Sequence, residues 1–199
     1  MPVILIIGNL MIFALNEHFM KEEFSKLDLY SRVPDADLIL EEVYSFFRGK
    51  DKLEVEEFNE REIQHMEDVR RMLNASKIVL YAAVAAFFIL LGVMLYHQKV
   101  PEKIISALSR FFVLGSLSSL AFFSALIIFL YFFFDPFFTG FHRLFFEGSS
   151  WLFDPRREVI VLVFPNQIFV DIVFYSLIYI MIELVIILAA GFFLKKLSI

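Results

Sequence analysis

The sequence predicts an all-α integral membrane protein with four transmembrane helices. Of its 199 residues, 59% are hydrophobic, whereas an ordinary soluble domain is about 45–50% apolar. The excess is concentrated in four blocks, which are residues 2–15, 78–96, 111–134 and 172–194. Three of these blocks reach the length of about 20 residues that a helix needs to cross a bilayer. Between them, the sequence predicts a small helical extracytoplasmic domain and an aromatic-rich outer loop.

The first block is short for a membrane span. Residues 2–15 are apolar apart from Gly8 and Asn9, but no basic residue precedes them and no small-residue cleavage site follows. A cleaved signal peptide would carry both features. We therefore interpret residues 1–16 as a short first span, a signal anchor whose natural start is expected to be truncated. A cleaved or interfacial segment is the alternative.

Residues 17–75 form the only sizeable polar segment, with 16 acidic and nine basic side chains. A helical pattern opens after Pro34-Asp35 and ends at Gly49. Asn59 then has the position of a cap for a second helix, which has no breaker before the next apolar block. About 60 residues are marginal for an independent core, so we expect these helices to lean on the membrane or the outer loop. The acidic excess gives no support to nucleic-acid binding, which requires a basic patch.

The remaining chain follows a pattern of span, short connector and loop. Spans 2 and 3 are expected within residues 76–134, with a basic connector over 97–110, and span 4 within residues 172–199 together with a C-terminal tail. Residues 135–171 form the outer loop. Short basic segments stay in the cytoplasm, so the connector and both termini are predicted to be cytoplasmic. The polar segment and the outer loop then face the extracytoplasmic side.

Two histidines on the outer side are the candidates for chemistry. His65 and Asp68 lie three apart on a predicted helix and share a face, so the carboxylate can hold the imidazole in one tautomer. His142 lies between Phe141 and Arg143, where desolvation lowers the pKa of an imidazole and keeps it neutral, as a general base requires. The alternatives are a solvated helix face for His65 and an interfacial histidine beside a headgroup anchor for His142.

Three further features stand out near the outer loop and in the last span. Trp151 is able to donate its indole N–H to a substrate, although anchoring at the interface is the alternative. Residues 159–164 have the pattern of a buried extended chain. Glu183 is the one charge in the last span, where such groups are costly and usually functional. A bond from its carboxyl to a serine of the third span is the other interpretation.

Several classes of chemistry lack their motifs. The chain has no cysteine, which excludes disulfides and thiolate nucleophiles. There is no P-loop, dinucleotide fingerprint or G-x-S-x-G elbow. The histidines do not show the H-E-x-x-H spacing of a zinc protease. No metal and no other cofactor is therefore predicted.

Two spaced motifs resemble a known family. The first is Phe141-His142-x-x-Phe145-Phe146, followed by Trp151-x-Phe153-Asp154-Pro155, Val159-Ile160 and Pro165. The second is His65-Met66-x-Asp68-Val69-Arg70-x-x-Leu73, with Asn16-Glu17 after the first span. In this order they resemble the lipoprotein intramolecular transacylase (Lit) family of small bacterial integral membrane proteins. The chain departs from the family in its short first span and in Glu158, where aspartate is expected.

The resemblance implies an acyltransferase of the bacterial cell membrane. Its substrates are diacylglyceryl-modified lipoproteins, and it moves the sn-2 acyl chain to the α-amine of their N-terminal cysteine, which gives the lyso form. His65 and His142 are then the acid and base, and Asp68 orients His65. The expected substrate contacts are Arg70, Arg143, Trp151, Phe141 and Phe145. The alternatives are a non-enzymatic lipid- or lipoprotein-binding protein and a different interfacial lipid hydrolase, such as a zinc-dependent amidase.

Overall fold

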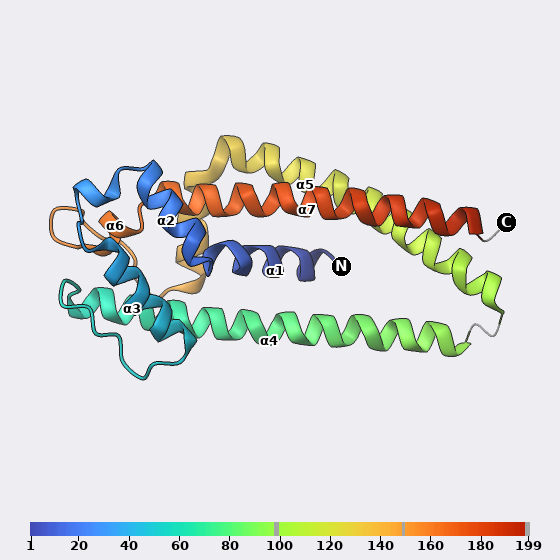
Figure 1. Cartoon of the computed structure of the whole chain (residues 1–199), viewed down its shortest axis with the longest axis horizontal. Helices are drawn as coiled ribbons and strands as arrows, with labels where there is room; N and C mark the ends of the chain where they lie inside the picture. Colours follow the sequence, from blue (N-terminus) through green and yellow to red (C-terminus); the bar gives the residue numbers. More distant parts are fainter. Residues whose placement is uncertain (98–99, 149, 198–199) are drawn as a thin grey trace. The chain divides into compact units, whose positions relative to one another are not determined.

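The computed structural model describes residues 1–97, 100–148 and 150–197, and every regular element in these ranges is a helix (Figure 1). In chain order the elements are α1 (Pro2–Ala14), α2 (Glu17–Lys26), the 3-10 helix η1 (Leu29–Ser31), α3 (Ala36–Arg48), α4 (Glu60–His97), α5 (Pro101–Phe145), α6 (Ile160–Val163) and α7 (Asn166–Leu197). Within the described ranges α4, α5 and α7 are long and apolar enough to cross a membrane. The short α1 qualifies only together with α2, and the two are bent by 64°. The predicted all-α class is confirmed, and the described residues contain three to four candidate membrane helices where the sequence predicted four.

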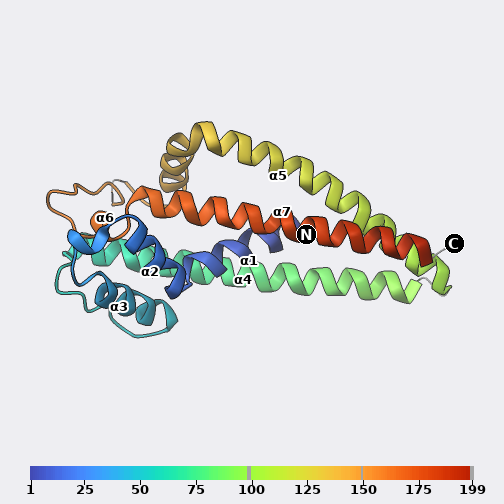
Figure 2. The same ribbon diagram turned by 45° about the horizontal axis from the view of Figure 1, so that its top comes forward.

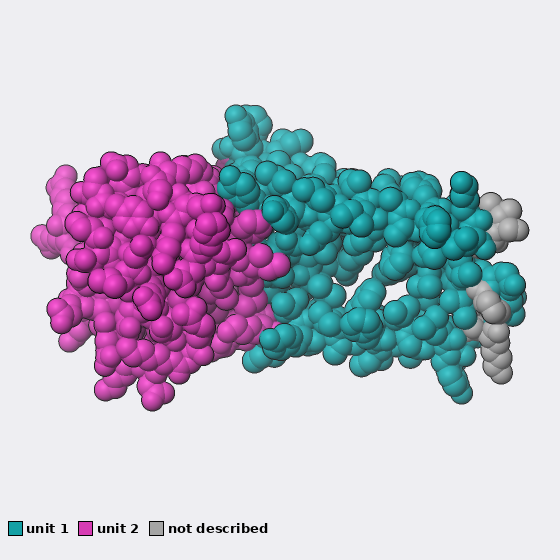
Figure 3. All heavy atoms as spheres, in the orientation of Figure 1, with its two compact units in different colours: residues 1–9, 78–132, 174–199 teal, residues 10–77, 133–173 magenta. Residues whose placement is uncertain are grey.

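The chain divides into two compact units (Figure 3). Unit 1 comprises residues 1–9, 78–132 and 174–199, and unit 2 comprises residues 10–77 and 133–173. The apolar, uncharged stretches of α4 and α5 belong to unit 1. Unit 2 holds the polar segment after α1 and the chain between α5 and α7. Charged side chains recur along the first turns of α4, so this part of the helix lies outside the stretch that can cross a bilayer.

Unit 2 is built around an apolar core that α2 and α3 share with the start of α4 (Figure 2). The largest side chains that are fully buried there are Phe24, Leu29, Leu40, Val43, Phe46, Val163 and Ile168. Gly49 ends α3 with a φ of 124°, a conformation that favours glycine. The Lys50 N–H then bonds back to the Ser45 carbonyl at 3.0 Å. The helix predicted between Pro34 and Gly49 is therefore confirmed.

α4 begins at the predicted cap. The Asn59 side-chain oxygen accepts the N–H groups of Arg61 and Glu62 at 2.9 and 3.1 Å. In return, the Glu62 carboxylate accepts the Asn59 N–H at 2.8 Å, which completes a capping box. The helix then runs for 38 residues to His97 without a break. The expectation that this helix continues into the second span is confirmed.

Two segments that were expected to connect the spans contain more helix than the sequence suggested. The connector expected over residues 97–110 is mostly helix, because α5 already starts at Pro101, and proline is favoured at a first helical position. Residues 98–99 of that connector lie outside the described ranges. The loop expected over 135–171 is also largely helical, since α5 continues to Phe145 and α7 begins at Asn166.

A break in α5 explains why Pro136 does not end the helix. Phe133 has the non-helical angles φ −130° and ψ 30°. A proline ring clashes with the carbonyl four residues before it and has no N–H to donate. Because the helix is broken at Phe133, it needs neither the carbonyl position that the proline ring would clash with nor the hydrogen bond that proline cannot donate. A second helical stretch therefore starts there and carries His142. The extended chain expected over residues 159–164 is also wrong: the Phe164 N–H bonds to the Ile160 carbonyl at 2.8 Å within α6.

Polar contacts join helices within the described part of unit 1. The Ser109 hydroxyl donates to the Gly191 carbonyl at 2.9 Å, which joins α5 to α7. The Asn9 amide of α1 donates to the Glu183 carboxylate of α7 at 3.0 Å and also to the Leu5 carbonyl. The partner of Glu183 is therefore an amide of the first helix and not the serine of the third span that the sequence suggested.

Candidate active site

The structure brings His65 and His142 together in unit 2. His65 lies on the second turn of α4 and His142 on the last turns of α5. Their ring centroids are 6.4 Å apart and the rings are tilted by only 21°. The side chains are largely shielded from solvent, with 8% and 9% of their residue surfaces exposed. Two imidazoles from opposite halves of the sequence thus share one enclosed space.

Aromatic rings enclose the histidine pair. The Phe146 ring lies 4.8 Å from the His65 ring and 5.2 Å from the His142 ring. Phe153 packs edge-on against His65 at 5.3 Å, and Trp151 packs against His142 at 4.9 Å. Such a lining removes water and strengthens every electrostatic interaction within it.

The backbone of α5 selects the tautomer of His142. Its Nδ1 lies 2.8 Å from the Phe138 carbonyl oxygen, one turn back along the helix. A carbonyl only accepts, so Nδ1 carries the proton and donates it. Nε2 is then left with its lone pair in the neutral ring. That nitrogen is available to accept a proton from a substrate.

Burial keeps both imidazoles neutral. Desolvation, with a smaller contribution from the nearby His142, lowers the pKa of His65 to about 4, and the Asp68 charge partly opposes this shift. Desolvation also lowers the pKa of His142, and the bond to the Phe138 carbonyl opposes that shift. A neutral imidazole is the form that a general base needs at neutral pH.

Three polar atoms, one on His65 and two on the neighbouring residues 150–151, have no partner among the described residues. They are Nδ1 of His65, Oγ of Ser150 and Nε1 of Trp151, and all three are buried. A buried polar group without a hydrogen bond costs about 1–3 kcal/mol, so such atoms in a folded protein call for an explanation.

Two of the predicted site residues have other contacts. Asp68 forms an ion pair with Arg71, and the described structure has no hydrogen bond between Asp68 and His65. The Arg70 guanidinium lies 3.9 Å over the centre of the Phe46 ring and donates to the Lys50 carbonyl at 2.9 Å. Asp68 therefore acts on His65 only through its charge, and Arg70 joins α4 to α3 rather than to the histidine pair.

The remaining predicted contacts lie at the edge of the cluster. The Phe141 ring packs on the Phe145 ring at 4.8 Å and meets the edge of His142 at 5.5 Å. Phe145 is 56% exposed and Arg143 is also exposed. These three residues therefore form an outward-facing border of the site, while Trp151 belongs to its interior.

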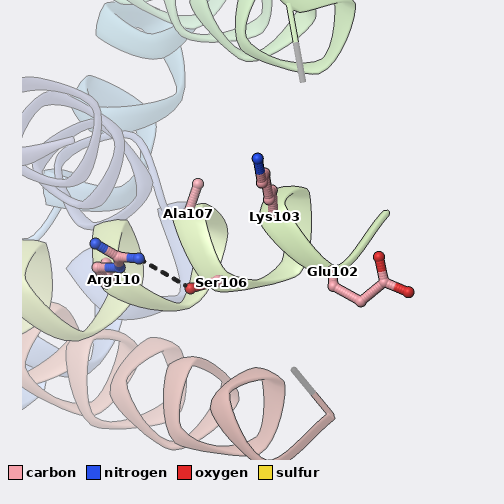
Figure 4. A pocket seen from close by; sticks show the side chains of 5 residues that line it. All are labelled: Glu102, Lys103, Ser106, Ala107 and Arg110. Carbon is pink, nitrogen blue, oxygen red and sulfur yellow. Dashed lines mark hydrogen bonds between the residues drawn. The ribbon is translucent and has the colours of Figure 1, made fainter. Parts of the chain in front are cut away.

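A surface pocket in unit 1 offers no comparable chemistry. Figure 4 shows its lining, which is formed by Glu102, Lys103, Ser106, Ala107 and Arg110. The Arg110 guanidinium donates to the Ser106 hydroxyl at 3.2 Å. The lining contains no imidazole. Among the residues that the structure describes, no cluster of three or more histidine and acidic side chains could hold a metal ion.

Comparison with known proteins decides the family. The family model described as lipoprotein intramolecular transacylase Lit matches residues 1–169. The chain belongs to the Lit family. It is thus an acyltransferase that acts on lipoproteins, and the function expected from the two motifs is confirmed. A Lit family member is a membrane protein, in agreement with the apolar helices.

Solved structures have the same fold. The membrane-integral Lit from Bacillus cereus is 19% identical, with a TM-score of 0.82 over 98% of this chain and 90% of that one. Two further structures of that protein, with one histidine replaced by alanine or by arginine, have TM-scores of 0.77 at 19% identity. They cover 98% of this chain and 88% and 86% of theirs. No curated protein matches the sequence.

The residues that hold the aromatic lining in place left little signal in the sequence. Glu158, at which the Lit resemblance led us to expect aspartate, is buried and pairs with Arg61 at 3.2 Å. Arg61 also donates to the Leu152 carbonyl at 2.8 Å. The Glu62 carboxylate accepts the Ile160 N–H at 2.7 Å. The N-x-x-E capping pattern was a signal for Glu62, but no local pattern indicates the pairing of Arg61 with Glu158.

Proposed function

We propose that His142 and His65 catalyse the acyl shift of this Lit family member directly, without an acyl-enzyme. The observation that supports this best is the enclosed, nearly parallel pair of imidazoles beside unpartnered polar atoms. The acyl chain moves from the sn-2 oxygen of the diacylglyceryl group to the α-amine of the same cysteine. One ester C–O bond breaks and one amide C–N bond forms, so no energy source is needed.

The main barrier to this reaction is conformational. Direct attack closes an eight-membered ring through the amine nitrogen, two cysteine carbons, sulfur, two glyceryl carbons, the ester oxygen and the carbonyl carbon. Such a ring is flexible, and holding it near the attack geometry recovers up to roughly 7–11 kcal/mol in the best intramolecular cases. The amine also has a pKa of about 7.7–8.0, so its protonated form first releases one proton to solvent, and the neutral amine then attacks.

The geometry suggests separate roles for the two histidines. His142 takes the amine proton on Nε2, because its Nδ1–H is already bonded to the Phe138 carbonyl. His65 gives an N–H proton to the departing glyceryl oxygen, as a neutral imidazole is able to do. The imidazolium of His142 then returns a proton to His65. One proton thus moves from nitrogen to oxygen, and both rings end as they began.

Trp151 is the best candidate to stabilise the oxyanion. Of the three donors considered, its indole N–H is buried without a partner in the described structure, whereas Arg70 is bonded to Lys50 and Arg143 is exposed. A good donor of this kind is worth about 2.7–4 kcal/mol. We further propose that Phe141 and Phe145 contact the acyl chains, that Arg143 provides charge near the headgroup, and that Asp68 tunes His65 through its field.

The proposed topology places the histidine pair outside the cell. Four spans, with α1 as the short first one, put both termini in the cytoplasm of a bacterial cell. The basic residues Lys103, Arg110, Lys195 and Lys196 favour this orientation. The domain limits proposed from the sequence (1–16, 17–75, 76–134, 135–171 and 172–199) then describe alternating membrane and extracytoplasmic parts.

A synthetic lipopeptide tests the proposal. The purified protein is incubated in detergent with a peptide whose N-terminal cysteine carries a diacylglyceryl group and a free amine. Because the shift is intramolecular, the product has the mass of the substrate, and tandem mass spectrometry must find the acyl chain on the amine. A peptide with an acetylated amine is the control and stays unchanged. If folded protein leaves the acyl chain of the free-amine peptide on the glyceryl oxygen, the proposal is contradicted and a lipoprotein-binding role is favoured.

A further inference from the structure

We propose that Glu62 is a positioning residue for acyl transfer. Together with Arg61 it fastens residues 152–160 to the first turn of α4, and this holds Trp151 and Phe153 against the histidine pair. The inference rests on the proposed function, because it concerns the site assigned above. Neither residue contacts the reacting atoms in this scheme.

The contacts of Glu62 go beyond those of a helix cap. A capping box needs one carboxylate oxygen, and here that oxygen accepts the Asn59 N–H at 2.8 Å. The second oxygen accepts the Ile160 N–H at 2.7 Å, so it reaches the segment between α5 and α7. The side chain is almost completely buried, with 1% of the residue exposed. A carboxylate is expensive to bury unless hydrogen bonds satisfy it, and these two bonds do so while fixing the start of α6.

Arg61 fastens the other end of the same segment. One guanidinium nitrogen donates to the Leu152 carbonyl at 2.8 Å, and another pairs with the Glu158 carboxylate at 3.2 Å. The second oxygen of Glu158 accepts the Asp154 N–H. The Arg61 guanidinium also lies 5.4 Å from the centre of the Phe153 ring. The segment is thus bonded at its start, in its middle and, through Glu62, at its end.

Arg61 and Glu62, which we call the clamp, share one face of α4 with His65. His65 follows Glu62 by three residues, so the two side chains lie one above the other on neighbouring turns. Leu152, which Arg61 holds, is flanked by Trp151 and Phe153, and these rings contact His142 and His65. Irregular segments move more than the elements they connect. A misplacement of about 1 Å in a site can cost about 10²-fold in rate, so the clamp would set the rate through the position of these two rings.

Glu62→Gln tests the inference directly. Glutamine keeps the size and one acceptor oxygen, but it sets an NH2 group against one of the two backbone N–H groups. We expect kcat on the lipopeptide to fall about tenfold or more, with KM changed less than about threefold. Trp151 is the only tryptophan of the chain, so its fluorescence reports the segment without any substrate. Its emission should shift to longer wavelength and become easier to quench with acrylamide.

Matched variants separate positioning from stability. Glu67→Gln changes an exposed glutamate on the same helix and should leave kcat and emission unchanged. Arg61→Gln, at an exposed position, removes the Leu152 and Glu158 contacts and should shift emission and lower kcat in the same direction. Glu158→Asp, which keeps the carboxylate, should retain both values. Thermal unfolding is measured for all of them, and kinetics are compared well below the lowest melting temperature.

Two results would overturn the inference. One is a folded Glu62→Gln protein with wild-type kcat and an unshifted Trp151 emission. The other is a kcat loss in Glu62→Gln and Arg61→Gln that disappears once each protein is fully folded, which would mean a purely structural role. An inactive wild-type protein would instead count against the proposed function, and the fluorescence comparison would still be informative about the clamp.

Discussion

The imidazole rings of His65 and His142 lie 6.4 Å apart and nearly parallel, with the Phe146 ring against both. Each histidine lies on a long helix, and packing within unit 2 fixes both rings in the absence of substrate. Groups that are held in place in this way need little reorganisation during reaction, which is a main source of enzymatic rate. The following predictions test what this arrangement does.

Loss of either imidazole should abolish most of the acyl shift. For His142→Gln and His65→Gln we expect rate losses of about 10²–10⁴-fold, the usual contribution of general acid–base catalysis. The larger loss is expected for His142, because it removes the proton from the amine. His18→Gln, at an exposed position on α2, serves as the control. The product is followed by tandem mass spectrometry, and near-normal rates in both site variants would refute the two-histidine scheme.

Trp151→Phe should lower kcat while the site stays packed. The substitution keeps an aromatic ring against His142 but deletes the indole N–H. Removal of one oxyanion donor typically costs about 10²–10³-fold in kcat. Steady-state kinetics on the lipopeptide give the measurement, and a thermal melt checks the fold. If kcat is unaffected, Trp151 is an interfacial anchor.

His65 should stay neutral well below the pH at which a free imidazole is protonated. Burial holds its pKa at about 4 in the folded protein, against about 6.5 in the unfolded chain. Between these values the unfolded state binds more protons, so stability falls as the pH is lowered, by up to about 1.4 kcal/mol per pH unit. The loss begins near pH 6.5 and ends near pH 4.

Nuclear magnetic resonance is able to measure this shift. The ring signals of protein labelled at histidine are followed from pH 8 to pH 4, and the His65→Gln spectrum identifies the signal. We expect no titration of His65 above about pH 5. A midpoint near 6.5 would mean that the ring is solvated and that the aromatic lining does not exclude water.

Arg70 should matter for stability rather than for chemistry. Its guanidinium lies over the Phe46 ring at 3.9 Å and bonds the Lys50 carbonyl. A cation–π contact of this kind is worth about 0.5–2 kcal/mol. Arg70→Ala should therefore lower the melting temperature but change kcat less than about threefold at low temperature. Arg70→Lys, which keeps the charge, should recover part of the stability. A large kcat loss in a folded Arg70→Ala protein would mean instead that Arg70 contacts the substrate.

Gly191 is expected to tolerate no side chain. A Cβ at this position would lie 2.9 Å from a Val113 methyl group and 3.0 Å from the Val113 nitrogen, so α5 and α7 would have to separate. Overpacking of this kind costs about 1–3 kcal/mol. Gly191→Ala should therefore lower the melting temperature in detergent. Gly92→Ala is the matched control, because a Cβ there meets no atom within 4 Å, and alanine in a helix is favoured by about 0.5–1 kcal/mol. A Gly191→Ala protein that melts at the same temperature as the wild-type protein would contradict the close packing of α5 against α7 at this position.

Local sequence was a good guide to the helices and to those ends that have a capping residue. Asn59 and Gly49 marked a helix start and a helix end correctly, because each satisfies backbone groups through its own neighbours. A loop was expected from residue 135 onward, although a break at Phe133 lets α5 continue past Pro136. An extended chain was expected over residues 159–164, where the structure has α6. The Ile160 N–H of α6 bonds to the distant Glu62 carboxylate, a contact that the local sequence does not indicate.

The sequence by itself determined that the chain has apolar helices able to span a membrane, an acidic helical segment and two histidine motifs of the Lit family. These features depend on composition and on neighbours a few residues apart. Only the tertiary structure decided which groups meet: the pairing of His65 with His142, the bond from Glu62 to Ile160, and the placement of Arg70 on Phe46. Each of these joins parts of the chain that no helical or strand period connects. Distant contacts of this kind are specified by the packing of the whole unit, and packing leaves no periodic pattern in the sequence.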